Sequence, residues 1–206
     1  MSAPRKLPIG VLISGSGTNL QVLIDRMNTG ELDVDIRVVL CNKADAFGLE
    51  RARAAGIPAV HVDPAAFSDA NSYNHALRVE LEAHGCEIVV MAGYMKLLGK
   101  AVLDAYPNRV LNIHPALLPS FAGAHGISDA FDYGVKVTGV TVHFANEVFD
   151  EGPIIAQEAV RIAEDDTLAS LEARIHEVEY RLYPAAIQLL AEERLEIVGR
   201  KVRIRE

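Results

Sequence analysis

Asn112 and His114, two residues apart, are the side chains of this sequence best placed to do chemistry. The apolar pair Val110-Leu111 precedes them, and residues i and i+2 of a strand point to the same face. Pro115 cannot extend a central strand, so we expect both side chains at the carboxyl end of one. An amide N–H beside an imidazole suits a carbonyl that becomes an oxyanion during acyl transfer. The spacing fits equally well with polar groups that merely cap a turn.

A glycine-containing loop, Ser14-Gly15-Ser16-Gly17-Thr18-Asn19, follows the strand expected over 9–13 and opens a helix. Anion sites use this order, because glycine lets the backbone approach a ligand and the N–H groups that begin a helix favour negative charge, by about 0.3–1 kcal/mol. The loop has neither the third glycine of Gly-x-Gly-x-x-Gly nor the lysine of a Walker loop, so a dinucleotide or a nucleoside triphosphate is not indicated. The alternative is a tight turn that only begins the helix.

Strands and helices alternate through the first half of the chain, and these elements must position both motifs. Beyond the strand at 9–13, we expect strands over 35–41, 59–62 and 87–91, and helices over 20–27, 45–55, 71–84 and 101–106. Apolar strands alternating with helices predict an α/β fold, a doubly wound, mostly parallel open sheet with helices on both faces. Ligands bind such sheets at the carboxyl ends of the strands, where Asn112 and His114 are expected.

The last third of the chain is expected to add one or more antiparallel strands. The stretch Val137–Phe144 alternates between apolar and polar residues and predicts a half-buried strand. It is followed by a loop over 146–152, a strand over 153–162, a long helical region over 167–190, and a weakly alternating tail over 195–204 that can pair as an edge hairpin.

The composition fits one globular domain. The 206 residues are 50% hydrophobic and 23% charged, which is ordinary for a folded chain. The net charge of −8 is not offset by a long Lys/Arg run, so nucleic acid is not expected as a partner. No window approaches the length of an apolar membrane span, so we expect a cytoplasmic protein without a membrane partner. Cys41 and Cys86 lie in apolar runs without metal-ligand spacing and are expected to be reduced and structural.

Five motifs occur in order over nearly the whole chain: ISGSGTNLQ at 13–21, AGYM at 92–95, NIHPALLPSF at 112–121, VTG at 137–139 continuing to His143, and DEGPII at 150–155. Each motif alone is moderately specific, and the five together at these spacings are very specific. In this combination the chain resembles the folate-dependent phosphoribosylglycinamide formyltransferases of purine biosynthesis. The resemblance implies their Rossmann-like formyltransferase fold.

The resemblance also implies a one-carbon transfer. The amine of N1-(5-phospho-D-ribosyl)glycinamide would attack the formyl group of the co-substrate 10-formyltetrahydrofolate, giving the N-formyl product and tetrahydrofolate in de novo purine (IMP) biosynthesis. Asn112 would donate a hydrogen bond to the formyl oxygen as it becomes an oxyanion, and His114 would stabilise that charge and donate a proton. Asp150 would favour the imidazolium and move a proton from the attacking to the leaving nitrogen. The reaction needs no metal, and none is expected.

By the same resemblance, the binding residues lie on four segments. Gly17, Thr18 and Asn19 would hold the phosphate of the ribonucleotide, and Glu179 its glycinamide amine. The pterin would contact the backbone of 95–98, and the loop over 146–150 would close on the folate. The expected folate-binding residues are Met95, Lys96, Leu97, Leu98, Asn112, Asn146, Glu147, Val148, Phe149 and Asp150.

Pattern alone gives plainer interpretations of three of these positions. The large apolar residues of 95–98 fit either a flat aromatic-binding slot or ordinary core packing, and the pattern favours core packing. Glu179 is expected to be solvated. His143 is either a core imidazole satisfied by hydrogen bonds or a member of the site. The inner face of the helix that carries Glu179 is assigned to Leu171, Ile175, Val178 and Leu182.

The chain departs from the family pattern at a few positions. Ala70 stands where the family usually has an arginine that meets the carboxylated folate tail, and Lys96 stands where an arginine or another basic residue is usual. Proline is usual at Ala122, and a basic residue is often found within 127–129. We therefore expect a weak dependence on the glutamate tail of the folate and a looser loop before Gly123.

We expect a single formyltransferase domain over 1–206, with a phosphate-binding half over 8–100 and a catalytic and folate-binding half over 101–206. It would act on small-molecule substrates as a monomer or homodimer. Two other families, the start-tRNA formyltransferases and the formyltetrahydrofolate hydrolases, share the Asn, His and Asp. Each carries an additional domain for which this chain is not expected to have room. A non-catalytic nucleotide-binding module could use the glycine loop alone, but the complete set of Asn112, His114 and Asp150 argues against it.

Overall fold

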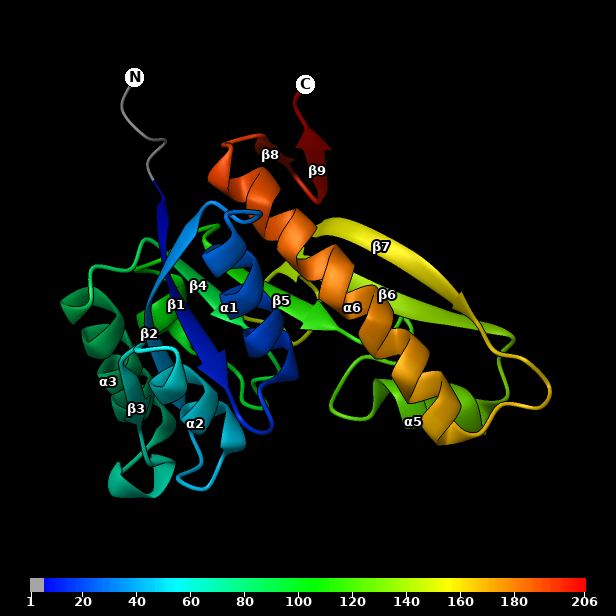
Figure 1. Cartoon of the computed structure of the whole chain (residues 1–206), viewed down its shortest axis with the longest axis horizontal. Helices are drawn as coiled ribbons and strands as arrows, with labels where there is room; N and C mark the ends of the chain where they lie inside the picture. The colour runs from blue at the N-terminus through cyan, green and yellow to red at the C-terminus, as the bar shows by residue number, and fades with distance from the viewer. Residues whose placement is uncertain (1–5) are drawn as a thin grey trace. The chain divides into compact units, whose positions relative to one another are not determined.

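The computed structural model describes residues 6–206, and its helices and strands form two compact units (Figure 1). The first unit ends at Leu111 and the second runs from Asn112 to Glu206. Strand β5 (Val110–His114) begins at the end of the first unit and continues into the second. The expected single domain, with halves over 8–100 and 101–206, stays a prediction.

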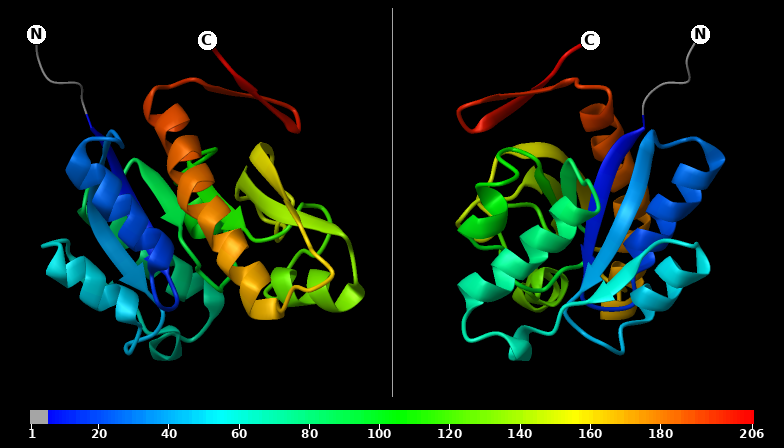
Figure 2. Two further views of the ribbon diagram at one scale, coloured as in Figure 1. Left: turned by 45° about the vertical axis from the view of Figure 1, so that its right-hand side comes forward. Right: turned by 90° about the vertical axis from the view of Figure 1, so that its left-hand side faces the viewer.

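The first unit holds four parallel strands in the order β3-β2-β1-β4. Figure 2 shows α1 and α2 on one face of these strands and α3 on the other. The strands are β1 (Leu7–Ile13), β2 (Val34–Cys41), β3 (Ala59–His61) and β4 (Ile88–Met91). The helices are α1 (Thr18–Thr29), α2 (Phe47–Ala54), the 3-10 helix η1 (Pro64–Ala66), α3 (Ala70–Ala83) and α4 (Lys100–Leu103).

Local sequence explains where these elements begin and end. Strands β1 and β4 are nearly continuous runs of buried apolar residues, as strands covered on both faces require. Helix α3 begins at Ala70 because the Asp69 carboxylate accepts a hydrogen bond from the Ser72 N–H at 2.7 Å, within a capping box. Helix α1 ends before Gly30, whose φ of 77° lies in the left-handed region that glycine adopts without penalty.

The second unit has the strand order β5-β6-β7-β9-β8. Strand β6 (Val137–Phe144) pairs antiparallel with β7 (Ile154–Arg161). Strands β8 (Leu195–Val198) and β9 (Lys201–Ile204) form an antiparallel hairpin, and β9 runs parallel to β7. Helix α6 (Leu168–Ala191) packs against β6 and β7, and α5 (Gly126–Tyr133) packs against α6 (Figure 1).

The structure confirms the predicted α/β class, with mostly parallel pairing in the first unit and antiparallel strands toward the C-terminus. The strand over 137–144 has the predicted bounds, and the tail over 195–204 pairs as a hairpin. The helix expected over 101–106 is shorter, since α4 ends at Leu103. The sequence pattern did not predict α5, which begins with a glycine and is 8 residues long.

The two cysteines are free and buried, as predicted. Burial raises the pKa of the Cys86 thiol to about 12, so this group is a packing residue rather than a nucleophile. Within residues 6–206, no helix has both the length and the apolar character needed to cross a membrane.

Candidate active site

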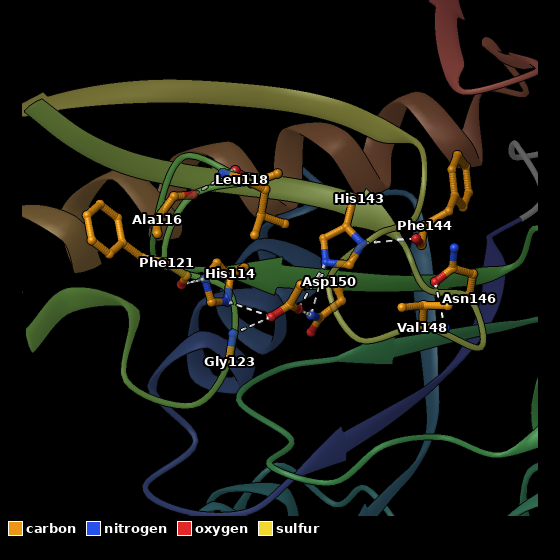
Figure 3. Close-up of polar contacts among 12 residues, drawn as sticks. His114, Ala116, Leu118, Phe121, Gly123, His143, Phe144, Asn146, Val148 and Asp150 are labelled. Atoms are coloured by element: carbon orange, nitrogen blue, oxygen red, sulfur yellow. Dashed lines mark hydrogen bonds and ion pairs between the residues drawn. The ribbon is translucent and has the colours of Figure 1, made fainter. Parts of the chain in front are cut away.

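The carboxyl end of β5 brings Asn112 and His114 to the same carboxylate. Oδ1 of Asp150 lies 3.4 Å from Asn112 Nδ2, and Oδ2 lies 3.5 Å from His114 Nδ1 (Figure 3). Two side chains of one strand can share a carboxylate only if they point to the same face. The structure therefore confirms the prediction that these two residues face the same way.

His114 is held by the backbone that follows β5. Its imidazole is 4% exposed, and Nε2 lies 2.8 Å from the carbonyl oxygen of Phe121. A carbonyl can only accept, so Nε2 donates and Nδ1 is the nitrogen that faces Asp150. A Cβ at Gly126 would lie 3.0 Å from Nε2, so this position needs a residue as small as glycine. The ring is thus fixed in both position and tautomer.

Asp150 is a buried carboxylate surrounded by groups that stabilise its charge. The residue is 8% exposed and adopts a φ of 57°, and its Oδ2 accepts the Gly123 N–H at 2.9 Å. Burial alone would raise its pKa. The contact with His143, the Gly123 N–H and the charge that His114 can carry outweigh burial and hold the pKa of Asp150 below its ordinary value. Asp150 is therefore an anion at neutral pH.

His143 on β6 completes this group, which we call the Asp150 cluster: Asn112, His114, His143 and Asp150. Its Nδ1 lies 2.9 Å from the carbonyl oxygen of Phe144, so Nδ1 donates there. Its Nε2 lies 3.2 Å from Asn112 Nδ2 and 3.6 Å from Asp150 Oδ1. Of the two interpretations of His143, the structure confirms the core imidazole satisfied by hydrogen bonds, and membership of the site stays a prediction. His143 is a hydrogen-bonded imidazole, 1% exposed, and it also contacts the predicted catalytic residues.

The glycine loop of the first unit has the predicted order of strand, loop and helix. Gly17 directly precedes α1 with a φ of 70°, and Thr18 and Asn19 are the first residues of that helix. No side chain caps this end of α1. A Cβ at Gly17 would lie 2.7 Å from Gly48 Cα, so both the backbone angle and the packing call for glycine here. Phosphate binding at this loop stays a prediction.

The segment Met95–Leu98 is only partly packed into the core. Met95 and Leu97 are 62% and 51% exposed, whereas Leu98 is 2% exposed. The expectation of ordinary core packing is therefore wrong for Met95 and Leu97 and confirmed for Leu98. The Met95 N–H donates to Ser14 Oγ at 2.9 Å, which ties this segment to the end of β1. Lys96 Nζ lies 6.0 Å from the centre of the Tyr73 ring on α3.

The loop over 146–150 leads directly into the Asp150 cluster. Asn146 Oδ1 accepts the Val148 N–H at 3.1 Å, which forms a local turn. Val148 and Phe149 are 52% and 40% exposed. Two exposed apolar side chains beside a buried carboxylate fit a loop that packs on a ligand.

Glu179 is buried rather than solvated, which corrects the expectation from pattern. It is 5% exposed on α6, because it lies four residues after Ile175 and therefore on the same inner stripe of the helix. Its Oε2 lies 2.9 Å from His176 Nδ1. The inner stripe also continues through Tyr183 rather than Leu182, which is only partly buried.

The predicted site residues thus fall into separate groups. Asn112 and His114 each contact Asp150 within the second unit. Glu179 lies on α6 of that unit, and the segments 17–19 and 95–98 belong to the first unit. Their use of one common substrate stays a prediction. In the described part of the chain, no group of three or more His, Cys, Asp or Glu could hold a metal ion.

Comparisons with known proteins agree with one another. The profile of the formyl transferase family matches residues 7–187. The phosphoribosylglycinamide formyltransferase of Bacillus subtilis (strain 168) is 40% identical over 180 residues, which are 87% of this chain and 92% of that protein. The trifunctional purine biosynthetic protein adenosine-3 of Homo sapiens is 41% identical over 91% of this chain, which spans 18% of that longer protein. The crystal structure of glycinamide ribonucleotide transformylase 1 from Symbiobacterium toebii matches with a TM-score of 0.96 and 50% identity, over 99% of this chain and 96% of that one.

Proposed function

The chain belongs to the formyl transferase family, and we propose that it transfers the formyl group of 10-formyltetrahydrofolate to the amine of N1-(5-phospho-D-ribosyl)glycinamide. The products are the N-formyl ribonucleotide and tetrahydrofolate, as in de novo purine biosynthesis. The observation that carries this proposal is the shared contact of Asn112 and His114 with the buried anion Asp150. An amide donor, an imidazole and a carboxylate are the groups that formyl transfer to an amine requires.

Asn112 and His114 stabilise the oxyanion that forms when the amine attacks the formyl carbon. The two contacts of Asn112 Nδ2, at 3.2 and 3.4 Å, lie at and just beyond the long end of the range for an N–H hydrogen bond. One of these N–H groups can therefore turn to the formyl oxygen at small cost. A donor of this kind is worth roughly 10²–10³ in rate.

Asp150 manages the proton balance. The attacking amine must lose a proton and the leaving folate nitrogen must gain one before the tetrahedral intermediate collapses. Because Asp150 is ionised and faces His114 Nδ1, it stabilises a positive imidazole while the oxyanion exists. The proton that the attacking amine loses is accepted by Asp150 and then passed to the leaving folate nitrogen.

The remaining assignments concern binding. Gly17, Thr18 and Asn19 hold the phosphate with backbone N–H groups at the start of α1. The buried carboxylate of Glu179 receives the glycinamide amine. The backbone of 95–98 receives the pterin, and the loop over 146–150 covers the folate. We further propose that the protein acts in the cytoplasm on these small molecules, as a monomer or homodimer, and without a metal.

The test is a coupled assay with both substrates and the purified protein. We expect a folate absorbance change that depends on the ribonucleotide, together with an N-formyl ribonucleotide of the correct mass. Release of formate without the ribonucleotide would instead identify a formyltetrahydrofolate hydrolase. No turnover of the folate, with or without the ribonucleotide, would refute the proposal and would favour a non-catalytic binding module.

A further inference from the structure

Two consecutive carbonyl groups of the glycine loop point to helix α2. The Gly48 N–H donates to the Gly15 carbonyl at 3.1 Å, and Arg51 Nε donates to the Ser16 carbonyl at 2.9 Å. Both donors belong to α2, Gly48 in its first turn and Arg51 in its last. Close packing of Gly17 against Gly48 brings the loop and the helix together, since a Cβ at Gly17 would lie 2.7 Å from Gly48 Cα.

These contacts also fix the direction of the N–H groups that share a peptide with the two carbonyls. Both peptides are trans, and in a planar trans peptide the N–H points away from the C=O. The carbonyl of Gly15 shares a peptide with the Ser16 N–H, and the carbonyl of Ser16 shares one with the Gly17 N–H. The N–H groups of Ser16 and Gly17 are therefore both aimed away from α2. Successive N–H groups aimed the same way beside a left-handed residue, as at Gly17, are typical of concave anion sites.

Arg51 is held in this position by more than the loop. Its Nη1 donates to Gln21 Oε1 on α1 at 3.1 Å, and its guanidinium lies over the Phe47 ring, 4.8 Å from the ring centre. The Gln21 side chain donates in turn to Asp25 Oδ1 at 2.8 Å. A planar guanidinium can hold two acceptors at a fixed angle, which an ammonium cannot. Arg51 thus connects α2 to both the loop and the helix that the loop opens.

We propose that Arg51 is a positioning residue for the phosphate of the substrate. Its hydrogen bond to the Ser16 carbonyl aims the Gly17 N–H at the anion. The positive guanidinium beside the Ser16 carbonyl also polarises the peptide group between Ser16 and Gly17, which makes the Gly17 N–H a stronger donor. The loop itself carries no lysine or arginine. The positive charge of Arg51 therefore acts on the anion site indirectly, through the peptide group between Ser16 and Gly17. The inference rests on the proposed function, which makes this loop the phosphate site.

The experiment compares three variants of the full chain by the KM of each substrate, kcat and the midpoint of thermal unfolding. Arg51→Met removes the charge and both bonds, and Arg51→Lys keeps the charge without the planar fork. Arg53→Met is the matched control, because Arg53 lies on the same helix, is exposed and pairs with Glu50. Arg51→Met should raise the ribonucleotide KM by about tenfold, the factor for one charge-assisted hydrogen bond, and change the folate KM by less than about twofold. Arg53→Met should change neither KM.

The conservative variant separates positioning from charge. Arg51→Lys should recover less than about a third of the lost affinity, because a single ammonium cannot hold Ser16 and Gln21 together. Full recovery by lysine, an equal rise of both KM values, or a lower unfolding midpoint with an unchanged ribonucleotide KM would each overturn the inference.

A binding measurement keeps this test independent of turnover. Inorganic phosphate is titrated into the wild-type protein and Arg51→Met while the amide NMR signals of Ser16 and Gly17 are followed. We expect saturable shifts in the wild type and about tenfold weaker binding in the variant. Absence of turnover in the wild type with these shifts intact would refute the proposed function alone. Amides that do not respond to phosphate in the wild type would overturn the positioning role.

Discussion

His114 and Asp150 face each other through Nδ1 and Oδ2 at 3.5 Å, while the other nitrogen of His114 donates to the Phe121 carbonyl at 2.8 Å. The same short stretch of backbone also supplies the Gly123 N–H, which donates to Asp150 at 2.9 Å. One segment therefore holds both members of the pair. The imidazole can gain a proton only on the side of the carboxylate, which is the side where its positive charge is stabilised.

Removing either polar residue of β5 should slow the reaction. We expect Asn112→Ala and His114→Gln each to lower kcat by about a hundredfold or more, the scale for loss of an oxyanion donor. Glutamine is chosen for His114 because the site is 4% exposed and alanine would leave a cavity. Steady-state kinetics check the prediction, with Asn71→Ala on the exposed side of α3 as the control. Either variant that keeps more than about a third of wild-type kcat would remove that residue from the mechanism.

Asp150→Asn should change both catalysis and the response to acid. We expect kcat to fall by about a hundredfold, the scale of general acid–base catalysis. The pKa of Asp150 is lowered in the folded state, so its charge stabilises the fold at neutral pH, and this contribution is lost as pH falls below about 4. The difference in unfolding free energy between wild type and variant should therefore shrink from pH 7 to pH 3. Urea denaturation measures it, and a difference that does not change with pH would contradict the assignment.

The sequence predicts that Asn112 and His114 point to the same face, because side chains alternate between the two faces of a strand with a period of two residues. Their contact with Asp150 did not follow from any pattern. It depends on positive φ angles at Phe121 and Asp150, of 54° and 57°, and such angles are uncommon for residues other than glycine. Only the family resemblance linked residues that are 36 or more positions apart in the chain.

Helix α5 and the burial of Glu179 show a second limit. Helix α5 begins at Gly126, a poor helix former, and packs against α6, so tertiary contact rather than local propensity sets its position. The helical pattern predicts a solvated Glu179, although its spacing from Ile175 places it on the buried stripe. The buried carboxylate of Glu179 interrupts the apolar stripe, and such departures from the folding pattern are expected at functional sites.

The contact between His176 and Glu179 predicts a measurable titration. The hydrogen bond to Glu179 raises the pKa of His176 above its ordinary value, against a smaller opposing effect of burial. We expect Glu179→Gln to lower the pKa of His176 in an NMR titration and to leave the exposed His61 as it is. The stabilisation from this pair is present below about pH 6.5 and is lost as pH rises through the folded-state pKa. An unchanged His176 titration would show that Glu179 does not set it.

Replacing Gly17 by valine should separate the two substrates. The side chain would meet Gly48 and stand where backbone is expected to meet phosphate, so affinity for the ribonucleotide should collapse while folate affinity survives. Isothermal titration of each ligand checks this. Gly85→Val is the matched control, because Gly85 has a similar φ of 66° but nothing within 4 Å of an added Cβ. Loss of both affinities in Gly17→Val, or the same loss in Gly85→Val, would count against a phosphate site at this loop.

Ala70→Arg tests how the protein meets the folate tail. Ala70 is the first residue of α3, and Lys96 Nζ lies 6.0 Å from the ring of Tyr73 on the same helix, so an arginine at 70 would add a second cation near the first turn of α3. A guanidinium can bind a carboxylate in a bidentate manner, which an ammonium cannot. We expect the substitution to lower KM only for folates that carry the glutamyl group. The gain in binding free energy should be no more than about 1 kcal/mol, because solvent screens an exposed ion pair. The measurement compares KM for folates with and without the tail, in wild type, Ala70→Arg and the neutral control Ala70→Gln. The same change in both folates would mean that position 70 does not meet the tail.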